Sequence, residues 1–252
     1  MITRIGLGIL AVVVLVGCTG IHAVTQSRSL GLELVLIGGG FFKMGDSFDG
    51  SNDDALPVHA VNLDSYYISR FETAFEQFDA FARTTDRPLP LSDEANRGTR
   101  AVVDVSWDEA TAFCAFAGGR LPTEIEWEYA ATGGIAKQKY AGTNNDLEID
   151  DFSHHRQNSG GISMPVGLKE PNLFGLYDMS GNVGEWVDDY YESYPEQGEK
   201  PVYNNPDERE MRRVRGGGVS SEVHVTRTYW RAGTLRDQRT PSIGFRCAVD
   251  AN

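Results

Sequence analysis

The chain has 252 residues, of which 40% are hydrophobic, and it carries a formal net charge of −13 at pH 7. This length and apolar content suffice for one sizeable core, and no internal repeat or low-complexity stretch divides the chain, so a single domain is expected. The acidic balance argues against nucleic acid or an anionic lipid surface as a partner, because both repel a negatively charged protein.

Residues 1–17 are interpreted as a targeting segment. One arginine precedes an apolar run over residues 5–16, which is shorter than the roughly 20 apolar residues of a membrane-spanning helix. The run ends in LVGC, residues 15–18, which resembles a bacterial lipobox, so that Cys18 becomes the lipidated first residue of the mature protein. The alternative is an ordinary secretory signal with Cys18 incidental. Residues 18–30 then form a lipidated tether, and resemblance to sorted lipoproteins implies the periplasmic face of the outer membrane.

The folded domain is expected over residues 31–252. Its first segment, Leu34–Met44, is apolar and rich in glycine, which predicts a strand, a tight turn and a second short strand. Three helices follow, each predicted from a capping box, in which a hydroxyl accepts from a first-turn amide and a glutamate three residues later accepts from the cap amide. The three boxes are Thr73–Glu76, Ser106–Glu109 and Thr123–Glu126.

Apolar spacing supports the first two helices, because in each of them small and aromatic residues recur on one face. These faces comprise Phe75, Phe78 and Ala82 in the first helix, and Trp107, Ala110, Cys114 and Ala117 in the second. Residues 135–170 are polar and lack periodicity, which indicates either disorder or a functional or ion-bound loop. The end of the chain, Arg213–Ala248, reads as short β pieces separated by glycines. The expected fold class is α+β, with few short helices, many short strands and a high loop content.

The segment NLFGLYDMSGNVGEW, residues 172–186, resembles the signature block of the formylglycine-generating-enzyme family, also called the sulfatase-modifying-factor family. Four further blocks match that family in order. They are GGGFFKMG (38–45), VDVSW (103–107), GRLPTEIEWEYA (119–130), and the C-terminal pair RGGG (215–218) with GFRCA (244–248). The resemblance spans nearly the whole mature chain and implies the family fold, a variant of the C-type lectin-like fold.

The resemblance implies a structural calcium site in the signature block. Asp178 and Glu185 would supply carboxylate oxygens, and Gly181 and Val183 would supply backbone carbonyls, in keeping with the six to eight oxygen ligands that Ca²⁺ takes. The alternative is that Asp178 and Glu185 cap local amides without a metal ion. A second calcium site of the family falls within residues 144–160, where no ligands can be assigned.

The chain has three cysteines, of which one is the expected lipidation site and two lie in the folded domain. If Cys18 is lipidated, Cys114 and Cys247 remain as an even pair in an oxidising compartment. In the family that the chain resembles, cysteines at these two places form a disulfide, and the resemblance implies the same pairing here.

The family's enzymes activate oxygen on a copper ion held by two cysteines, and this chain departs from that pattern. Counting from the Arg-Gly-Gly motif, the matching positions are Ser221 and Thr226, and no cysteine lies anywhere between Cys114 and Cys247. Hydroxyls are too hard, and their pKa too high, for the thiolate site that Cu(I) prefers. No copper is expected, and formylglycine synthesis by the copper route is not expected either.

Other polar residues near these positions are candidates for catalysis. If residues 219–226 form a strand, Glu222, His224 and Thr226 share one face beside Ser221, as a nucleophile and base require. The alternative is a polar groove wall without catalysis. The adjacent histidines His154 and His155 are expected to be solvated loop residues rather than metal ligands.

Two functional interpretations follow. The first, which we favour, is a lipid-anchored periplasmic protein that uses the family fold as a non-catalytic scaffold and binds an envelope protein partner, for example in type VI secretion regulation or gliding. The second is a diverged oxidoreductase acting on a periplasmic metabolite or peptide, held in a groove near Ser221, Glu222, His224 and Arg227.

Overall fold

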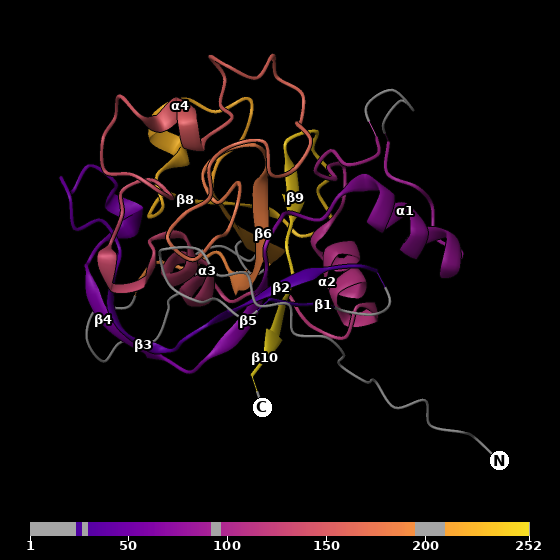
Figure 1. Ribbon diagram of the computed structural model, residues 1–252, viewed down its shortest axis with the longest axis horizontal. Helices are drawn as coiled ribbons and strands as arrows, with labels where there is room; N and C mark the ends of the chain where they lie inside the picture. The colour runs from indigo at the N-terminus through magenta and orange to yellow at the C-terminus, as the bar shows by residue number, and fades with distance from the viewer. Residues whose placement is uncertain (1–23, 27–29, 92–96, 195–209, 252) are drawn as a thin grey trace.

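The computed structural model describes residues 24–26, 30–91, 97–194 and 210–251. The predicted signal segment, residues 1–17, and the predicted lipidation site at Cys18 lie outside the described residues. The described part has the predicted α+β fold, with short helices and short strands joined by long loops (Figure 1). No helix in it is both long and apolar enough to cross a bilayer.

A four-stranded antiparallel sheet lies at the centre of the ribbon, in the order β1-β2-β5-β10. Its strands are β1 (Val24–Gln26), β2 (Glu33–Ile37), β5 (Tyr66–Ser69) and β10 (Ala248–Asp250). β1 falls within residues 18–30, the predicted tether, yet Val24 pairs with Val35 of β2. This part of the predicted tether is therefore a strand.

Two further sheets complete the β structure. One is the hairpin of β3 (Gly40–Met44) and β4 (His59–Leu63), so the predicted strand, turn and strand over Leu34–Met44 is confirmed, with β2 and β3 in separate sheets. The other has the order β8-β7-β6-β9, in which β6 and β9 run parallel. Its strands are β6 (Gly184–Tyr190), β7 (Met211–Arg215), β8 (Arg231–Leu235) and β9 (Ile243–Phe245).

The helices are α1 (Phe75–Thr84), α2 (Trp107–Phe116), α3 (Glu124–Ala131) and the short α4 (Ile149–Phe152). The capping boxes predicted for α2 and α3 are confirmed, with Ser106 and Thr123 as the caps. The predicted Thr73–Glu76 box is wrong, because α1 is capped by Ala74, whose amide donates to the Gln77 side chain at 3.0 Å. Thr73 instead uses its backbone to bridge Phe245 and Val102.

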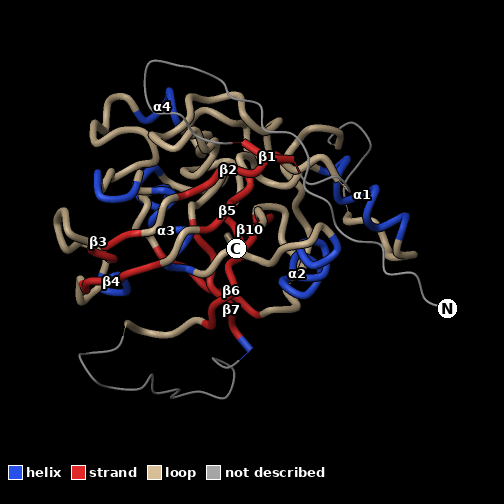
Figure 2. The backbone as a smooth tube through the Cα atoms, turned by 60° about the horizontal axis from the view of Figure 1, so that its bottom comes forward, coloured by secondary structure: helices blue, strands red, loops and turns tan. Residues whose placement is uncertain are grey.

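Two apolar clusters form the core, one on each side of the central sheet. The first packs α1 and α2 together, with the rings of Phe78 and Phe113 stacked 5.7 Å apart. The second surrounds Trp127 of α3 and Tyr66 of β5. Both views of the molecule place α1 and α2 on one side of it and the β3–β4 hairpin on the other (Figures 1 and 2).

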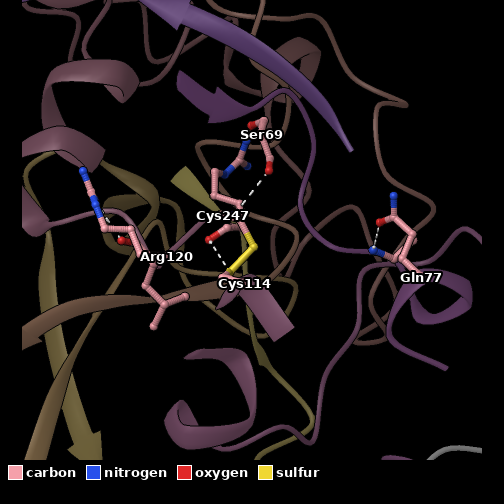
Figure 3. Close-up of a disulfide and its surroundings, with 8 residues drawn as sticks. Ser69, Gln77, Cys114, Arg120 and Cys247 are labelled. Atoms are coloured by element: carbon pink, nitrogen blue, oxygen red, sulfur yellow. Dashed lines mark hydrogen bonds between the residues drawn. A yellow bond between two sulfur atoms is a disulfide. The ribbon is translucent and has the colours of Figure 1, made fainter. Parts of the chain in front are cut away.

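A disulfide ties α2 to the C-terminal segment. Cys114 and Cys247 are joined by an S–S bond, 133 positions apart in the sequence, and both are buried (Figure 3). The amide of Cys247 donates to the Ser69 hydroxyl at 3.3 Å, which links the bridge to β5. A cross-link that closes so long a loop stabilises the fold by up to about 4–5 kcal/mol on the chain-entropy model.

Candidate functional site

The two positions that match the copper-binding cysteines lie on a tightly folded glycine-rich segment. The Ser221 hydroxyl accepts a hydrogen bond from the Gly218 amide at 3.0 Å, and the Thr226 hydroxyl donates to the Val223 carbonyl at 2.8 Å. A Cβ on Gly217 would lie 2.8 Å from the Val225 carbonyl oxygen, so only glycine fits this approach. Both hydroxyls thus serve the local backbone, and this donor set does not fit Cu(I), which prefers thiolates.

Residues 219–226 do not form the strand that a shared face of Glu222, His224 and Thr226 would require. Val223–Thr226 is a 3₁₀ helix, labelled η5, which follows the left-handed residues Gly216 and Gly217. Side chains in such a helix repeat every third residue, so Glu222, His224 and Thr226 do not share a face. Sequence alternation could not reveal this turn, because it depends on the backbone path through the glycines.

Two of the candidates on this segment, Glu222 and His224, are exposed to solvent. Glu222 pairs with Arg156 at 2.8 Å, and both side chains are about half exposed or more. The exposed His224 packs edge-to-face on Trp230, with ring centroids 5.1 Å apart. Neither residue contacts the hydroxyl of Ser221 or Thr226 in any recorded hydrogen bond among the described residues. A nucleophile and its base are therefore not assembled from these four candidates.

A second group of polar residues surrounds Arg227, and we call Phe48, Asp49, Ser51, Arg227 and Tyr229 the Arg227 cluster. Arg227 donates to the Ser51 hydroxyl at 3.0 Å and lies 3.5 Å from the Asp49 carboxylate. The ring of Phe48 stacks on Tyr229 at 5.4 Å. The Tyr229 side chain is buried beside Arg227, and burial raises the pKa of this phenol.

The sequence prediction included Arg227 but missed the other members of this cluster. Except for Tyr229, they come from a loop of residues 45–52, which Asp46 organises by accepting from the amides of Phe48 and Asn52 at 3.0 and 3.2 Å. The only available signal was the run DSFDGSND, residues 46–53, whose aspartates, serines, asparagine and glycine are typical of a structured turn. Nothing in that run indicates its contact with Tyr229.

The two carboxylates that the resemblance implies as calcium ligands differ in how many hydrogen bonds they already accept. Glu185 is fully buried, and its carboxylate accepts from Arg246 at 2.7 and 2.8 Å and from the Trp127 indole at 2.7 Å. Asp178 accepts from the Gly167 amide at 2.7 Å through Oδ2, while Oδ1 is buried without a described partner. Asp178 thus has one oxygen without a donor that could bind a calcium ion, whereas three donors already contact the Glu185 carboxylate.

No group of three or more His, Cys, Asp or Glu side chains in the described residues is arranged to hold a metal ion. A calcium shell at Asp178 would therefore need backbone carbonyls or solvent for most of its oxygens. Gly181 and Val183 adjoin this point, with their amides donating to the Gly216 carbonyl and the Glu72 carboxylate. Calcium in this block stays a prediction.

Asp178 and Glu185 belong to a larger buried group, together with Glu72 and Arg246, which we call the acidic cluster. Glu72 accepts from the Val183 amide at 3.1 Å and the Asn182 amide group at 2.5 Å. Burial, reinforced by the nearby Asp178 and Glu185 carboxylates, raises the pKa of Glu72 well above its usual value. Burial also raises the pKa of Asp178 to about 6. Three carboxyl groups here share one guanidinium.

A second buried group, which we call the arginine cluster, contains Glu124, Glu128, Arg215, Arg231 and Lys137. Glu124 is held by both nitrogens of the Arg231 fork, at 2.7 and 2.8 Å, and by Arg215 at 2.7 Å. Glu128 pairs with Arg215 at 2.8 Å and with Lys137 at 3.0 Å. Burial would raise the pKa of Glu124, but Arg231 and Arg215 outweigh it and hold that pKa at about 2.

The two adjacent histidines are buried, so the prediction of solvated loop residues is wrong. His155 Nε2 lies 2.8 Å from the Asp150 carboxylate. Neither ring nitrogen of His154 has a described partner, and burial lowers the pKa of His154 to about 4. The loop turns inward here because His154 forms a parallel bridge with Gly181 and accepts from the Asn182 amide at 2.8 Å.

The chain matches known proteins over most of its length. It is 30% identical to the formylglycine-generating enzyme of Streptomyces coelicolor, covering 86% of this chain and 89% of that protein. It is 34% identical to the inactive C-alpha-formylglycine-generating enzyme 2 of Bos taurus, covering 87% and 89%. The structure of PvdO from Pseudomonas aeruginosa superposes with a TM-score of 0.77 and 25% identity, covering 90% of this chain and 98% of that one.

The domain family described as the sulfatase-modifying factor enzyme 1-like domain matches residues 22–251. This range contains all three sheets and all four α-helices of the described fold, together with all five predicted sequence blocks. The chain therefore belongs to the formylglycine-generating-enzyme, or sulfatase-modifying-factor, family.

Proposed function

We propose that this protein is a non-catalytic member of its family that binds a protein partner in an assembly of the bacterial envelope, for example one that regulates type VI secretion or gliding. One observation carries the proposal. The two copper-binding positions hold Ser221 and Thr226, and both hydroxyls are bonded to the local backbone. The similarity to a relative named as inactive supports the same conclusion.

The surface near these positions suits binding. Glu222, paired with Arg156, and His224, packed on Trp230, present charge and an aromatic ring to solvent from a segment whose backbone is fixed by hydrogen bonds. A partner that meets such a surface loses little conformational freedom in the protein, which favours affinity. We infer that this segment, residues 221–230, forms part of the contact surface.

A crosslinked capture from detergent-solubilised envelopes, read by mass spectrometry, tests the proposal. The parent protein is compared with a Glu222→Ala, His224→Ala double variant. A double variant on the exposed face of α1, Glu76→Ala with Arg83→Ala, is the matched control. We expect one near-stoichiometric partner with the parent and the control, and its loss with the first variant. Absence of any such partner, or equal loss in both variants, overturns the proposed surface.

The membrane anchor in this proposal is a lipid on Cys18 at the periplasmic face of the outer membrane. Resemblance of residues 15–18 to a lipobox supports it. Replacement of Cys18 by Ser is expected to move the full-length protein from the membrane fraction to the soluble periplasmic fraction. Continued membrane association of the Cys18→Ser variant would defeat the lipoprotein interpretation and leave the binding proposal intact.

A diverged oxidoreductase acting on a periplasmic metabolite or peptide is the second candidate. The observation that favours it is the buried Tyr229 hydroxyl, which lies beside the cationic Arg227. Metabolite profiling of periplasm from a deletion strain, complemented with the parent or with Tyr229→Phe, separates the two functions. An accumulated precursor that the parent clears and Tyr229→Phe does not clear would favour the enzyme over the binding protein.

A further inference from the structure

A pocket of about 420 Å³ opens along the β3–β4 hairpin, and Lys137 of the arginine cluster is among the residues that line it. Its size lies in the range of small-molecule sites in proteins. Most of its lining comes from β3 and from the turn that contains η3 (Gly134–Ala136). The residues that line it are Phe41, Phe42, Lys43, Ser47, Ala60, Gly134, Ile135 and Lys137.

The rim of the pocket is apolar and unusually exposed. Phe41 is 69% exposed and Ile135 is 81% exposed, so both leave large apolar surfaces in water. The turn that projects Ile135 outward passes through Gly133 and Gly134 and ends at Lys137, all with positive φ. A non-glycine residue in that conformation costs free energy, and such residues concentrate at ligand sites. The exposure of Ile135 is therefore imposed by the backbone.

The floor of the pocket is packed and preformed. Phe42 meets Tyr129 edge-to-face, with ring centroids 5.1 Å apart. A Cβ on Gly134 would lie 3.0 Å from the Phe174 ring and 3.2 Å from Tyr129, so the turn sits close against both rings. A ligand entering this pocket meets a rigid apolar floor and needs no rearrangement of the fold, which lowers the cost of binding.

The charged groups of the pocket are both cationic, although the chain carries a net charge of −13. The Lys137 ammonium is 3.0 Å from the buried Glu128 carboxylate and 5.8 Å from the centroid of the Phe42 ring. Lys43 is exposed and makes no recorded hydrogen bond or ion pair with a described residue. No carboxylate lines the pocket, so Lys43 is left to attract an anion from solution.

We propose that this pocket binds a small amphipathic anion, whose aromatic or acyl body lies against Phe41 and Ile135 and whose single anionic group meets Lys43. The apolar rim provides the burial, and the ammonium selects the charge and orients the ligand. This site is separate from the surface of residues 221–230, and the proposal does not depend on the function proposed above.

Two fluorescent probes of the same body test both parts of the proposal. 8-Anilinonaphthalene-1-sulfonate has an aromatic body with one anionic group, and N-phenyl-1-naphthylamine lacks that group. For the folded parent protein we expect the sulfonate to bind at one site per chain. Ile135→Asp should raise its Kd about tenfold or more, because apolar contact is lost and a like charge is added. Lys43→Gln should raise it about two- to fivefold and leave the neutral probe unchanged.

Matched controls separate this site from general surface effects. Leu147→Asp makes the same change at another highly exposed aliphatic residue outside the lining, and Arg83→Gln removes one positive charge from α1 on the far side of the molecule (Figure 1). Neither control should change the Kd of either probe. Absence of saturable binding to the parent, or equal weakening by the pocket and control variants, overturns the proposal.

Discussion

Two buried charge clusters of this protein use opposite arrangements. In the arginine cluster, Glu124 accepts hydrogen bonds from the guanidinium groups of Arg231 and Arg215, and its pKa falls to about 2. In the acidic cluster, Asp178 keeps one buried oxygen without a described partner, and its pKa rises to about 6. Both carboxyl groups are buried. The difference shows that the supply of donors, and not burial alone, decides whether a buried carboxyl is charged.

The contrast also indicates different roles. A buried carboxylate that accepts from several guanidinium donors fixes the relative position of the elements that carry the ion pairs, here α3, β7 and β8. A buried carboxyl group without enough hydrogen-bond donors either takes up a proton or can bind a cation. The acidic cluster is therefore one part of this fold whose charge can change with pH.

The largest effect is expected from breaking the arginine cluster. Glu124→Gln leaves Arg231 and Arg215 buried without their shared carboxylate, which should lower the free energy of unfolding by about 3–5 kcal/mol at pH 7. Urea denaturation at constant calcium measures this change. Glu76→Gln, at an exposed position of α1, is the control and should change stability by less than about 0.5 kcal/mol. A small effect of Glu124→Gln would show that the cluster contributes little to stability.

The pH dependence of that effect sharpens the comparison. Since the pKa of Glu124 is depressed in the folded protein, its contribution is present above the unfolded value of about 4.5 and is lost as pH falls through about 2. The difference in unfolding free energy between the parent and Glu124→Gln should therefore shrink progressively between pH 4.5 and pH 2. A difference that stays constant over this window would contradict the assigned direction of the pKa shift.

In the acidic cluster, the charged carboxylate is expected to lower the free energy of unfolding rather than raise it. Because the pKa of Asp178 lies above its unfolded value of 3.8, its charged form destabilises the fold, and the loss grows as pH rises from about 4 to 6. In a chelator at pH 7.5, Asp178→Asn should therefore raise the unfolding free energy by about 1–3 kcal/mol. The gain should vanish near pH 4. Asparagine tolerates the left-handed conformation of this residue, which has φ of 58°.

Added calcium should make the parent protein more stable relative to Asp178→Asn. If Asp178 is a calcium ligand, as the family resemblance implies, added calcium raises the Tm of the parent and has no effect on Asp178→Asn. Glu185→Gln should destabilise the protein equally with and without calcium, because its carboxylate serves Arg246 and Trp127. Identical melting curves of the parent in calcium and in chelator would contradict the calcium prediction. They would not affect the comparison of the two buried charge clusters.

The smallest effect is expected at the surface pair of Glu222 and Arg156. Both side chains are well exposed, so solvent screens their attraction, and Glu222→Ala should lower stability by no more than about 1 kcal/mol. High salt should weaken this small contribution further, whereas it should hardly alter the effect of Glu124→Gln. Equal salt sensitivity at the two sites would contradict the contrast between exposed and buried pairs.

Local features of the fold were predicted well from the sequence. The caps Ser106 and Thr123 depend on residues three positions apart, and both form as predicted. The cap of α1 was misplaced because Thr73 is held by backbone contacts with Phe245, far along the chain. The same limit applies to η5, whose turn follows from Gly216 and Gly217. Where a competing long-range contact exists, a local motif alone does not fix the helix start.

The candidate site was only partly predictable for the same reason. Glu124 and Arg231 are 107 positions apart, and Glu72 and Asn182 are 110 positions apart. No spacing rule relates residues at such distances, so the arginine cluster was not anticipated, and of the acidic cluster only Asp178 and Glu185 were predicted to act together. Phe48 and Tyr229, which stack in the Arg227 cluster, were missed because aromatic residues in loops give no periodic signal.

By itself, the sequence determined that the site lacks a pair of thiolates. With no cysteine between Cys114 and Cys247, no folding of this chain can place two thiolates at the positions of Ser221 and Thr226. Only the tertiary structure decided how the remaining polar groups are used. Glu185 and Asp178 belong to one sequence motif. Arg246 donates hydrogen bonds to the Glu185 carboxylate, whereas Oδ1 of Asp178 is buried without a described donor. The state of a buried carboxyl depends on donors that only the folded chain brings to it.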